Sequence, residues 1–469
     1  MKADIVFGEW LPDLPAEANP GLVVAQNVYA TPNGYRPVKA VSAITTALAD
    51  FNGGAAFIGS DGTASLLAGT TTNLQRYSSS WSAVRTITAT GRWNFAQFGD
   101  LAICVFGGAP QKYNLLSGAA AALSGSPPNA GLVTTVRDFV VLAGNSAAND
   151  TLQWSAFNNA EGWTIGTNQS DDQRMLVGGA ITGLAGGEYG LILQRNRVTR
   201  MQYVGGDLVF QFDEIADNVG CIASGSVVQI GKLVFFLSER GFMMCDGSTV
   251  TPIGTEKIDR TFFAANARES FTKMYAAADP RNFIVAWSLP GNPGTVLLYN
   301  WALQRWSSAS VPLKGIFTGF TSNVSLEGVD TLYPSGIDSV VGSLDDAIFS
   351  GGNPLLLVAG WDTLIGPMTG TNLTATFQTG LLELVPGRFA RVANTTPQTD
   401  AVTGVTVTMD ARQRAGTAGV VTTSTDLRNN GDVPMRANGR YFYGTLTVID
   451  PACSYVRGIR LDVNAAGAQ

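Results

Sequence analysis

Three adjacent pairs of acidic residues are the first candidates for chemistry in this chain. They are Asp171-Asp172, Asp213-Glu214 and Asp345-Asp346. Two carboxyl groups are enough for glycoside hydrolysis, in which one protonates the leaving group and the other activates water or attacks the sugar. Neighbouring residues of a strand point to opposite faces, so an adjacent pair does not form such a site by itself. We interpret these residues as solvated loop acids.

The residue types that support most other chemistry are missing or isolated. The chain has 469 residues and no histidine, which excludes Ser-His-Asp and Cys-His catalysis and metal sites built on imidazole. No CxxC pair occurs among its four cysteines, which are Cys104, Cys221, Cys245 and Cys453. We interpret them as reduced and buried, with a single disulfide as the alternative. Since the sequence also lacks a glycine-rich phosphate loop, we expect no catalytic residue, no cofactor and no bound metal.

Composition and charge indicate a folded, acidic protein. Hydrophobic residues make up 45% of the chain and charged residues 14%, below the usual charged share of about 25%. Lys and Arg total 30 against 36 Asp and Glu, so the net charge is -6. Tight nucleic-acid binding needs a basic field, so we expect no tight general binding of DNA, although a local basic patch stays open. No leader-like apolar stretch follows Met1 and no apolar run reaches about 18 residues, so we expect cytoplasmic synthesis and no membrane span.

A strand-turn-strand unit recurs six times between residues 64 and 300. Each unit has a turn, a continuous apolar strand, a second turn and a strand that ends in an anchor residue. The apolar strands are expected at 64–69, 101–106, 139–144, 189–193, 233–237 and 283–287. The anchors are Tyr77, Tyr113, Trp154, Tyr203, Cys245 and Tyr299, which lie 36, 41, 49, 42 and 54 residues apart. Periods of about 40–50 residues are typical of β-propeller blades, although a β-sandwich with many hairpins is the alternative.

We predict an all-β protein in three parts. Residues 1–50 form an N-terminal arm with a hairpin at Asn33-Gly34, which could close the propeller by pairing with its last blade. Residues 51–370 form a β-propeller of about six blades, with an irregular closing segment between about 313 and 360. Residues 371–469 form a β-sandwich, because apolar and polar residues alternate in several segments there. One helix is expected near 255–267, capped at Thr255-Glu256.

Several segments resemble the phage stabilisation, or tail hub, family of short-tailed bacteriophages. The resemblance begins at Trp10-Leu-Pro-Asp-Leu-Pro15 and continues through residues 27–37. It includes Val219-Gly-Cys-Ile222, Phe235-Phe-Leu-Ser238 and the stretch 252–259, and it extends to Gly439-Arg-Tyr441 near the end of the chain. These loose patterns carry no catalytic residues and are spread over most of the chain, while the loop from 313 to 360 matches poorly.

The resemblance implies a virion structural protein with no enzymatic activity. Subunits of this family form a ring, expected here to be a hexamer, below the portal and its adaptor. The ring retains packaged DNA, supports tail fibres or spikes, and is the nozzle through which double-stranded DNA leaves. A propeller suits such a ring because a rigid wedge presents two different faces to its neighbours. The expected location is the virion tail, after synthesis in the host cytoplasm.

Five residues are candidates for partner contact or for lining the channel. Trp10 is either a core residue or an exposed anchor for a partner. Asp171, Asp172, Glu214 and Asp217 are expected to face the channel, where carboxylates repel phosphates and let DNA slide. Two other functions stay open: a propeller glycosidase or lyase that uses carboxylates, and a propeller that binds a glycan or a protein.

Overall fold

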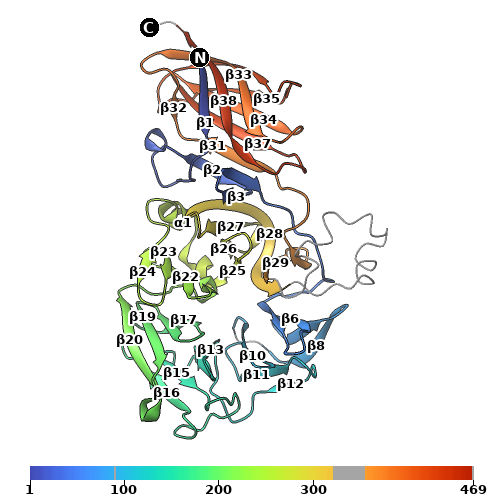
Figure 1. Cartoon of the computed structure of the whole chain (residues 1–469), viewed down its shortest axis with the longest axis vertical. Coiled ribbons are helices and arrows are strands. Elements are labelled where there is room, and N and C mark those ends of the chain that lie inside the picture. The colour runs from blue at the N-terminus through green and yellow to red at the C-terminus, as the bar shows by residue number, and fades with distance from the viewer. Residues whose placement is uncertain (89–90, 321–353, 467–469) are drawn as a thin grey trace.

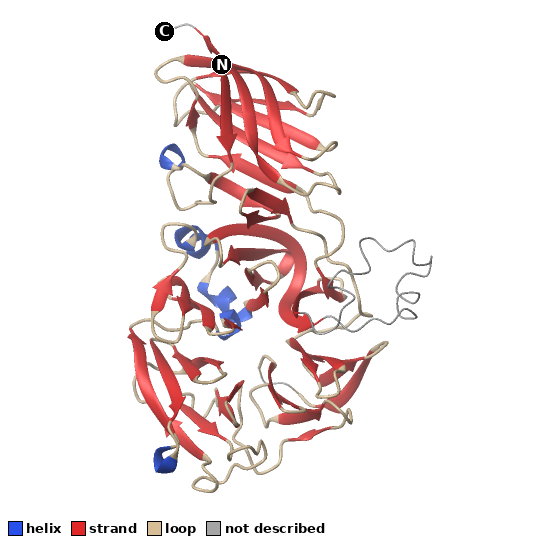
Figure 2. Ribbon diagram, viewed as in Figure 1, coloured by secondary structure: helices blue, strands red, loops and turns tan. Residues whose placement is uncertain are grey.

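The computed structural model describes residues 1–88, 91–320 and 354–466. The chain forms a flat ring of small antiparallel sheets, and a second all-strand body extends from one edge of this ring (Figure 1). Strands dominate both parts, while the described helices are few and short (Figure 2). The predicted class, an all-β chain with a β-propeller and a C-terminal β-sandwich, is confirmed.

Five separate four-stranded sheets form the first five blades of the propeller, and the strands of each pair in chain order. Blade 1 has β5 (Gly54–Ile58), β6 (Ala64–Gly69), β7 (Asn73–Tyr77) and β8 (Trp81–Thr86), and blade 2 has β9 (Asn94–Phe98), β10 (Leu101–Val105), β11 (Gln111–Asn114) and β12 (Ala120–Ala122). Blade 3 has β13 (Leu132–Val136), β14 (Phe139–Ala143), β15 (Thr151–Trp154) and β16 (Asp171–Arg174), and blade 4 has β17 (Ile181–Ala185), β18 (Gly190–Gln194), β19 (Arg197–Tyr203) and β20 (Phe210–Asp217). Blade 5 has β21 (Val228–Ile230), β22 (Leu233–Ser238), β23 (Gly241–Cys245) and β24 (Val250–Pro252).

One long strand links the sixth blade to the unit that closes the ring. Blade 6 consists of β25 (Tyr275–Asp279), β26 (Ile284–Leu289), β27 (Gly291–Asn300) and the first half of β28 (Arg305–Phe320). The second half of β28 pairs with β29 (Pro354–Gly360), which pairs in turn with β30 (Ile365–Pro367). β28 therefore runs from the outer edge of blade 6 to the inside of the ring, where it contacts β5 and β25. Within the predicted irregular segment, residues 321–353 lie outside the described residues.

The first strand of each blade lines the inside of the ring, and the fourth lies at its outer edge. First strands of consecutive blades contact one another, as β5 contacts β9 and β9 contacts β13. The six apolar strands predicted from the repeat are the second strands of the blades. Four of the six anchors end the third strands, and Tyr113 and Tyr299 lie one residue before the end. Second strands such as β14 and β18 are buried along their whole length, which explains why their sequences are continuously apolar.

Apolar side chains fill the spaces between neighbouring blades. Separate buried clusters join blades 1 and 2, 2 and 3, 3 and 4, and 4 and 5. The closing unit packs on blade 6 at one side and on blade 1 at the other. Because blades 1 to 5 are separate sheets, side-chain packing rather than a shared strand ladder holds them in one rigid ring.

Two sheets pack face to face in the second body. One sheet has β1 (Lys2–Val6), β3 (Val28–Thr31), β4 (Gly34–Pro37), β33 (Phe389–Thr399), β36 (Val433–Gly439) and β38 (Val456–Ala466). The other has β2 (Leu22–Gln26), β31 (Ala375–Thr379), β32 (Leu382–Glu383), β34 (Val405–Arg412), β35 (Val420–Ser424) and β37 (Tyr441–Val448). Alternate residues are buried between the sheets, such as Val405, Val407 and Met409 of β34. β2 also touches β28 in blade 6, so the second sheet continues into the propeller.

The hairpin part of the N-terminal arm belongs to the sandwich, while the end of the arm contributes to the unit that closes the propeller. The hairpin at Asn33-Gly34 forms as predicted, with Thr31 opposite Gly34. The arm then joins the C-terminal strands, because β1 pairs along β38 and β2 pairs along β31. Apolar residues of β2 and β3 complete the buried face of the sandwich. β28, β29 and β30 close the ring, and the N–H groups of Ser42 and Ile44 in the arm donate to the carbonyls of Pro367 and Ile365 in β30.

The described helices lie in connections. They are α1 (Asp259–Ala265) and the 3-10 helices η1 (Ala16–Ala18), η2 (Gly206–Leu208), η3 (Ser224–Ser226) and η4 (Arg268–Lys273). α1 begins later than predicted and lacks the expected cap at Thr255-Glu256, because the residue before it provides no side-chain cap. Its N-terminus is capped from the arm instead: the N–H groups of Arg260 and Thr261 donate to the carboxylate of Asp13 at 2.9 and 2.8 Å.

Candidate functional site

Side chains from different blades meet across the inner opening of the propeller. Arg92, from the connection between blades 1 and 2, donates a hydrogen bond to the carbonyl of Met274, just before blade 6. Its guanidinium carbon lies 3.6 Å from the ring centroid of Tyr275. Phe51 packs on Tyr275 and Phe317, at centroid distances of 5.9 and 5.6 Å. Burial lowers the pKa of Arg92 and raises that of Tyr275, because both charged forms lose water.

Trp10, a residue of the N-terminal arm, lies in the core. Its side chain is 9% exposed, and its indole Nε1 donates to the carbonyl of Val23 at 3.0 Å. The residue belongs to the cluster that joins blade 5, blade 6 and the sandwich. The interpretation of Trp10 as a core residue is confirmed. The alternative of an exposed anchor is wrong, because the indole side chain is buried in the protein interior.

Asp171 and Asp172 lie on β16, the outer strand of blade 3. Asp171 is partly exposed and accepts the backbone N–H of Asp172 at 2.9 Å, while Asp172 is exposed. The ion pair on this strand joins Arg174 to Asp150 at 2.8 Å. Within the described part of the chain, neither Asp171 nor Asp172 forms an ion pair, so both present uncompensated negative charge at the edge of the blade.

Glu214 and Asp217 lie on β20, the outer strand of blade 4, and share one partner. Arg197 contacts Glu214 at 2.9 Å and Asp217 at 3.3 Å. The neighbouring Asp213 pairs with Arg200 at 3.0 Å. Hydrogen bonds from Gln211 and Arg200 hold the pKa of Asp213 below its usual value. The acids of β20 are therefore largely compensated, unlike those of β16.

The four channel candidates gather on one side of the molecule. β16 and β20 are the outer strands of neighbouring blades: β16 lies on the part of the edge away from the sandwich, and β20 lies on the adjoining flank (Figure 1). Asp213 and Glu214 bind different arginines, as expected for neighbours that point to opposite faces. The third acidic pair, Asp345-Asp346, lies outside the described residues.

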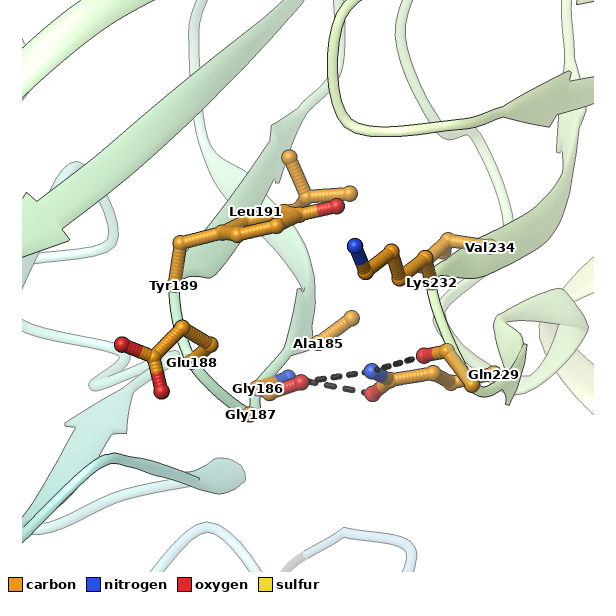
Figure 3. Close-up of a pocket in the computed structure, with 10 residues that line it drawn as sticks. Ala185, Gly186, Gly187, Glu188, Tyr189, Leu191, Gln229, Lys232 and Val234 are labelled. Carbon is orange, nitrogen blue, oxygen red and sulfur yellow. Dashed lines mark hydrogen bonds between the residues drawn. The ribbon is translucent and has the colours of Figure 1, made fainter.

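A small recess lies between blades 4 and 5 (Figure 3). Its volume is about 60 Å³, which is room for a few water molecules. Ala185, Leu191, Val234 and the ring of Tyr189 give it apolar walls, and Lys232 lies across the opening from Tyr189. The arrangement can accept a small aliphatic group. The sequence repeat did not reveal this recess, because the lining residues come from two units.

The amide side chain of Gln229 joins blades 4 and 5 by hydrogen bonds beneath this recess. Gln229 donates from Nε2 to the carbonyl of Gly186 at 2.5 Å and to that of Gly231 at 3.0 Å. Its Oε1 accepts the N–H of Gly186 at 3.1 Å (Figure 3). Gln97 makes the same kind of link between blades 2 and 1, to the carbonyls of Ile58 and Gly99. The walls of the recess are thus held by hydrogen bonds as well as by packing.

Two buried carboxyl groups meet where the N-terminal arm touches blade 5. The side chain of Asp259 is 7% exposed, and its Oδ1 accepts the N–H of Phe242 at 3.1 Å. Its Oδ2 has no partner among the described residues. Burial, helped by the charge of Asp13, raises the pKa of Asp259 to about 6. Sequence reasoning missed this pair, because 246 positions separate the two residues along the chain.

Other kinds of site find little support in the described residues. No group of three acidic or cysteine side chains there is close enough together to hold a metal ion. All four cysteines are free and buried, and burial raises the pKa of the Cys104 and Cys221 thiols. None of the helices in residues 1–88, 91–320 and 354–466 has the length and apolar character to cross a membrane.

Comparisons with known proteins find likeness in solved structures only. No protein-family model and no curated protein matches the chain. The N-terminal domain of Nup159 is 9% identical with a TM-score of 0.38, and the match covers 73% of this chain and 97% of that domain. BamB from Moraxella catarrhalis is 11% identical with a TM-score of 0.38, over 78% of this chain and 98% of that protein. A chain of the mitotic checkpoint complex is 10% identical with a TM-score of 0.40, and the match covers 72% of this chain and 95% of that chain.

Proposed function

We propose that this chain is a structural subunit of a virion tail, a hub or nozzle that assembles as a ring below the portal and its adaptor. The resemblance in the sequence motivates the proposal, and the position of the acidic residues supports it. β16 lies on the part of the propeller edge away from the sandwich, and β20 lies on the adjoining flank (Figure 1). With the sandwich pointing away from the ring axis, this edge lines the channel through which double-stranded DNA leaves.

The uncompensated charge of Asp171 and Asp172 is the observation that carries the proposal. Arg197 offsets part of the charge of Glu214 and Asp217, so those residues contribute less to the field. Asp171 and Asp172 have no such partner in the described residues. Their repulsion of phosphates extends over a Debye length of about 8 Å at physiological ionic strength. A ring of six such edges keeps DNA from adhering while it slides.

The arrangement of the two bodies also suits a structural subunit. The propeller is a rigid disk, and the sandwich is joined to its rim through a continuous sheet and a shared core. Such a subunit can use its disk to contact neighbouring copies, while the sandwich stays free to meet the adaptor or a tail fibre or spike. The proposed role needs no catalytic residue and no cofactor.

Mass spectrometry of purified particles tests the proposed function. We expect the chain in the particle at about half the copy number of the portal protein, as for six subunits on a twelve-fold portal. Absence from the particle would overturn the proposal. Glycan turnover by the purified chain, lost on changing a single acidic residue, would instead favour the carboxylate enzyme.

Charge reversal tests the placement of the acids in the channel. The double variant Asp171→Lys with Asp172→Lys is expected to assemble normally and to slow DNA ejection, because the added lysines attract phosphates. Asp426→Lys is the matched control, since it reverses an exposed acid on the sandwich. Equal ejection rates for the double variant and the control would refute the channel placement without affecting the particle measurement.

A further inference from the structure

The two broad faces of the propeller carry opposite net charge. One side of the propeller, which we call the AB face, is formed by two turns of each blade. These turns join the first strand to the second and the third strand to the fourth. The BC face is formed by the other turns and by the connections between blades. Among described residues of blades 1 to 6, the AB face carries seven acidic and three basic residues, whereas the BC face, without the buried Asp259 and Arg92, carries four acidic and six basic residues.

This charge pattern favours one mode of self-contact. When two copies meet through their AB faces, or through their BC faces, like charges approach one another. When the AB face of one copy meets the BC face of the next, opposite charges approach. The second contact uses two different surfaces and is therefore heterologous, the type that generates rings.

The AB face carries the recess described above. Its opening lies at the turns that join β17 to β18 and β21 to β22, with Lys232 at the rim. Glu188, also at the rim, has a side chain that is 82% exposed and whose carboxylate lies 3.8 Å from the guanidinium of Arg137. The recess therefore offers an apolar hole of side-chain size beside an exposed carboxylate.

The BC face carries an apolar projection that matches this recess. Leu176 and Val177 lie between β16 and β17 and are 79% and 57% exposed. Their loop is fixed at its base, because Gln194 donates from Nε2 to the carbonyls of Met175 and Gly179 at 3.3 and 2.7 Å. Arg174, which pairs with Asp150 at 2.8 Å and whose side chain is still 66% exposed, precedes the loop. A fixed leucine beside a guanidinium thus complements an apolar hole beside a carboxylate.

We infer that copies of this chain contact one another head to tail, with Leu176 of one copy seated in the recess between blades 4 and 5 of the next. The inference rests on the proposed function, since it supplies the contact that a ring of subunits requires. Arg174 then approaches Glu188 of the neighbouring copy. The opposite net charges of the two faces set the direction of stacking.

A disulfide trap tests this contact in the full chain. We expect a chain with both Leu176→Cys and Lys232→Cys, treated with oxidised glutathione, to give a ladder of covalent dimers, trimers and larger species. Each variant alone supplies only one half of the contact and is expected to stay uncross-linked. The natural cysteines are buried and provide no competing thiol. A ladder that stops at the dimer would overturn the head-to-tail arrangement.

The mass of the oligomer in solution gives an independent readout. Leu176→Asp is expected to weaken self-association about 30-fold or more, because it removes one buried leucine from the contact. Val420→Asp, an exposed position on the sandwich, is the control and should leave the mass unchanged. Two results would overturn the contact. One is that oligomers form equally well with Leu176→Asp; the other is that the natural chain stays monomeric in light scattering at about 200 μM, well above a dissociation constant in the micromolar range. The presence of the chain in particles decides the proposed function separately.

Discussion

The carboxyl group of Asp259 should make the stability of this protein fall as pH rises through the weakly acidic range. Its pKa is about 6 in the folded chain against 3.8 as an ordinary value, because burial and Asp13 disfavour the charged form. The folded state therefore holds this proton more tightly than the unfolded state. The stabilisation is complete below the unfolded pKa and is lost as pH rises through the folded pKa.

The expected size follows from the shift. About two pKa units at 1.36 kcal/mol each correspond to about 3 kcal/mol, of which about 2 kcal/mol falls between pH 4.5 and 7.5. Asp259→Asn removes the titration and keeps an oxygen that can accept the N–H of Phe242. The free energy of unfolding of the natural chain should thus fall by about 2 kcal/mol relative to Asp259→Asn over this range.

Urea denaturation of both proteins at several pH values measures this difference. Asp246→Asn is the matched control, because hydrogen bonds from Thr249 and Ser248 lower the pKa of Asp246 to about 2. The contribution of Asp246 to the free energy of unfolding has the opposite sign and disappears only as pH falls below about 4. The difference in stability between the natural chain and Asp246→Asn should therefore not change between about pH 4.5 and 7.5. Parallel stability curves for the natural chain and Asp259→Asn would refute the reasoning, since they would mean that Asp259 is ionised at pH 5 in the folded protein.

Two further changes test how the parts of the molecule are joined. Asp13→Ala removes the acceptor of two N–H groups of α1 and should destabilise the protein by about 1–2 kcal/mol in urea denaturation, whereas Asp207→Ala, an exposed acid, should have little effect. An equal effect of both would show that the cap contributes nothing. Arg92→Ala removes a hydrogen bond to Met274 and the contact with Tyr275, and should cost about 1–3 kcal/mol in thermal or urea unfolding. Unchanged stability would contradict a role for these contacts in holding the ring.

The sequence predicted the middle strands of the blades because their environment leaves a clear pattern. Strands such as β14, with Val140 and Val141, are buried on both faces and must be apolar throughout. The anchors that follow, such as Tyr113 and Trp154, are buried at the ends of the third strands. The inner and outer strands are shorter or partly exposed, as the exposed positions of β16 illustrate, so they leave a weaker pattern.

The position of the N-terminal arm could not be predicted from local sequence. Asn33-Gly34 determines a hairpin, since these residues suit a tight turn. Which sheet the hairpin joins depends on a partner at the far end of the chain, where Tyr35 pairs with Val456. Several blade edges offer similar backbone hydrogen bonds, so the choice is made by the apolar face that the arm completes in the sandwich.

Some features of the candidate sites follow from the sequence, and others follow only from the tertiary structure. Sequence alone determined that the chain has no histidine and that its acidic residues include adjacent pairs such as Asp171 and Asp172. Only the tertiary structure decided that Arg197 compensates Glu214 but not Asp172, and that Asp13 meets Asp259 in a buried site. The physical reason is that charge compensation and burial depend on distances between strands, which the order of residues along one strand does not contain.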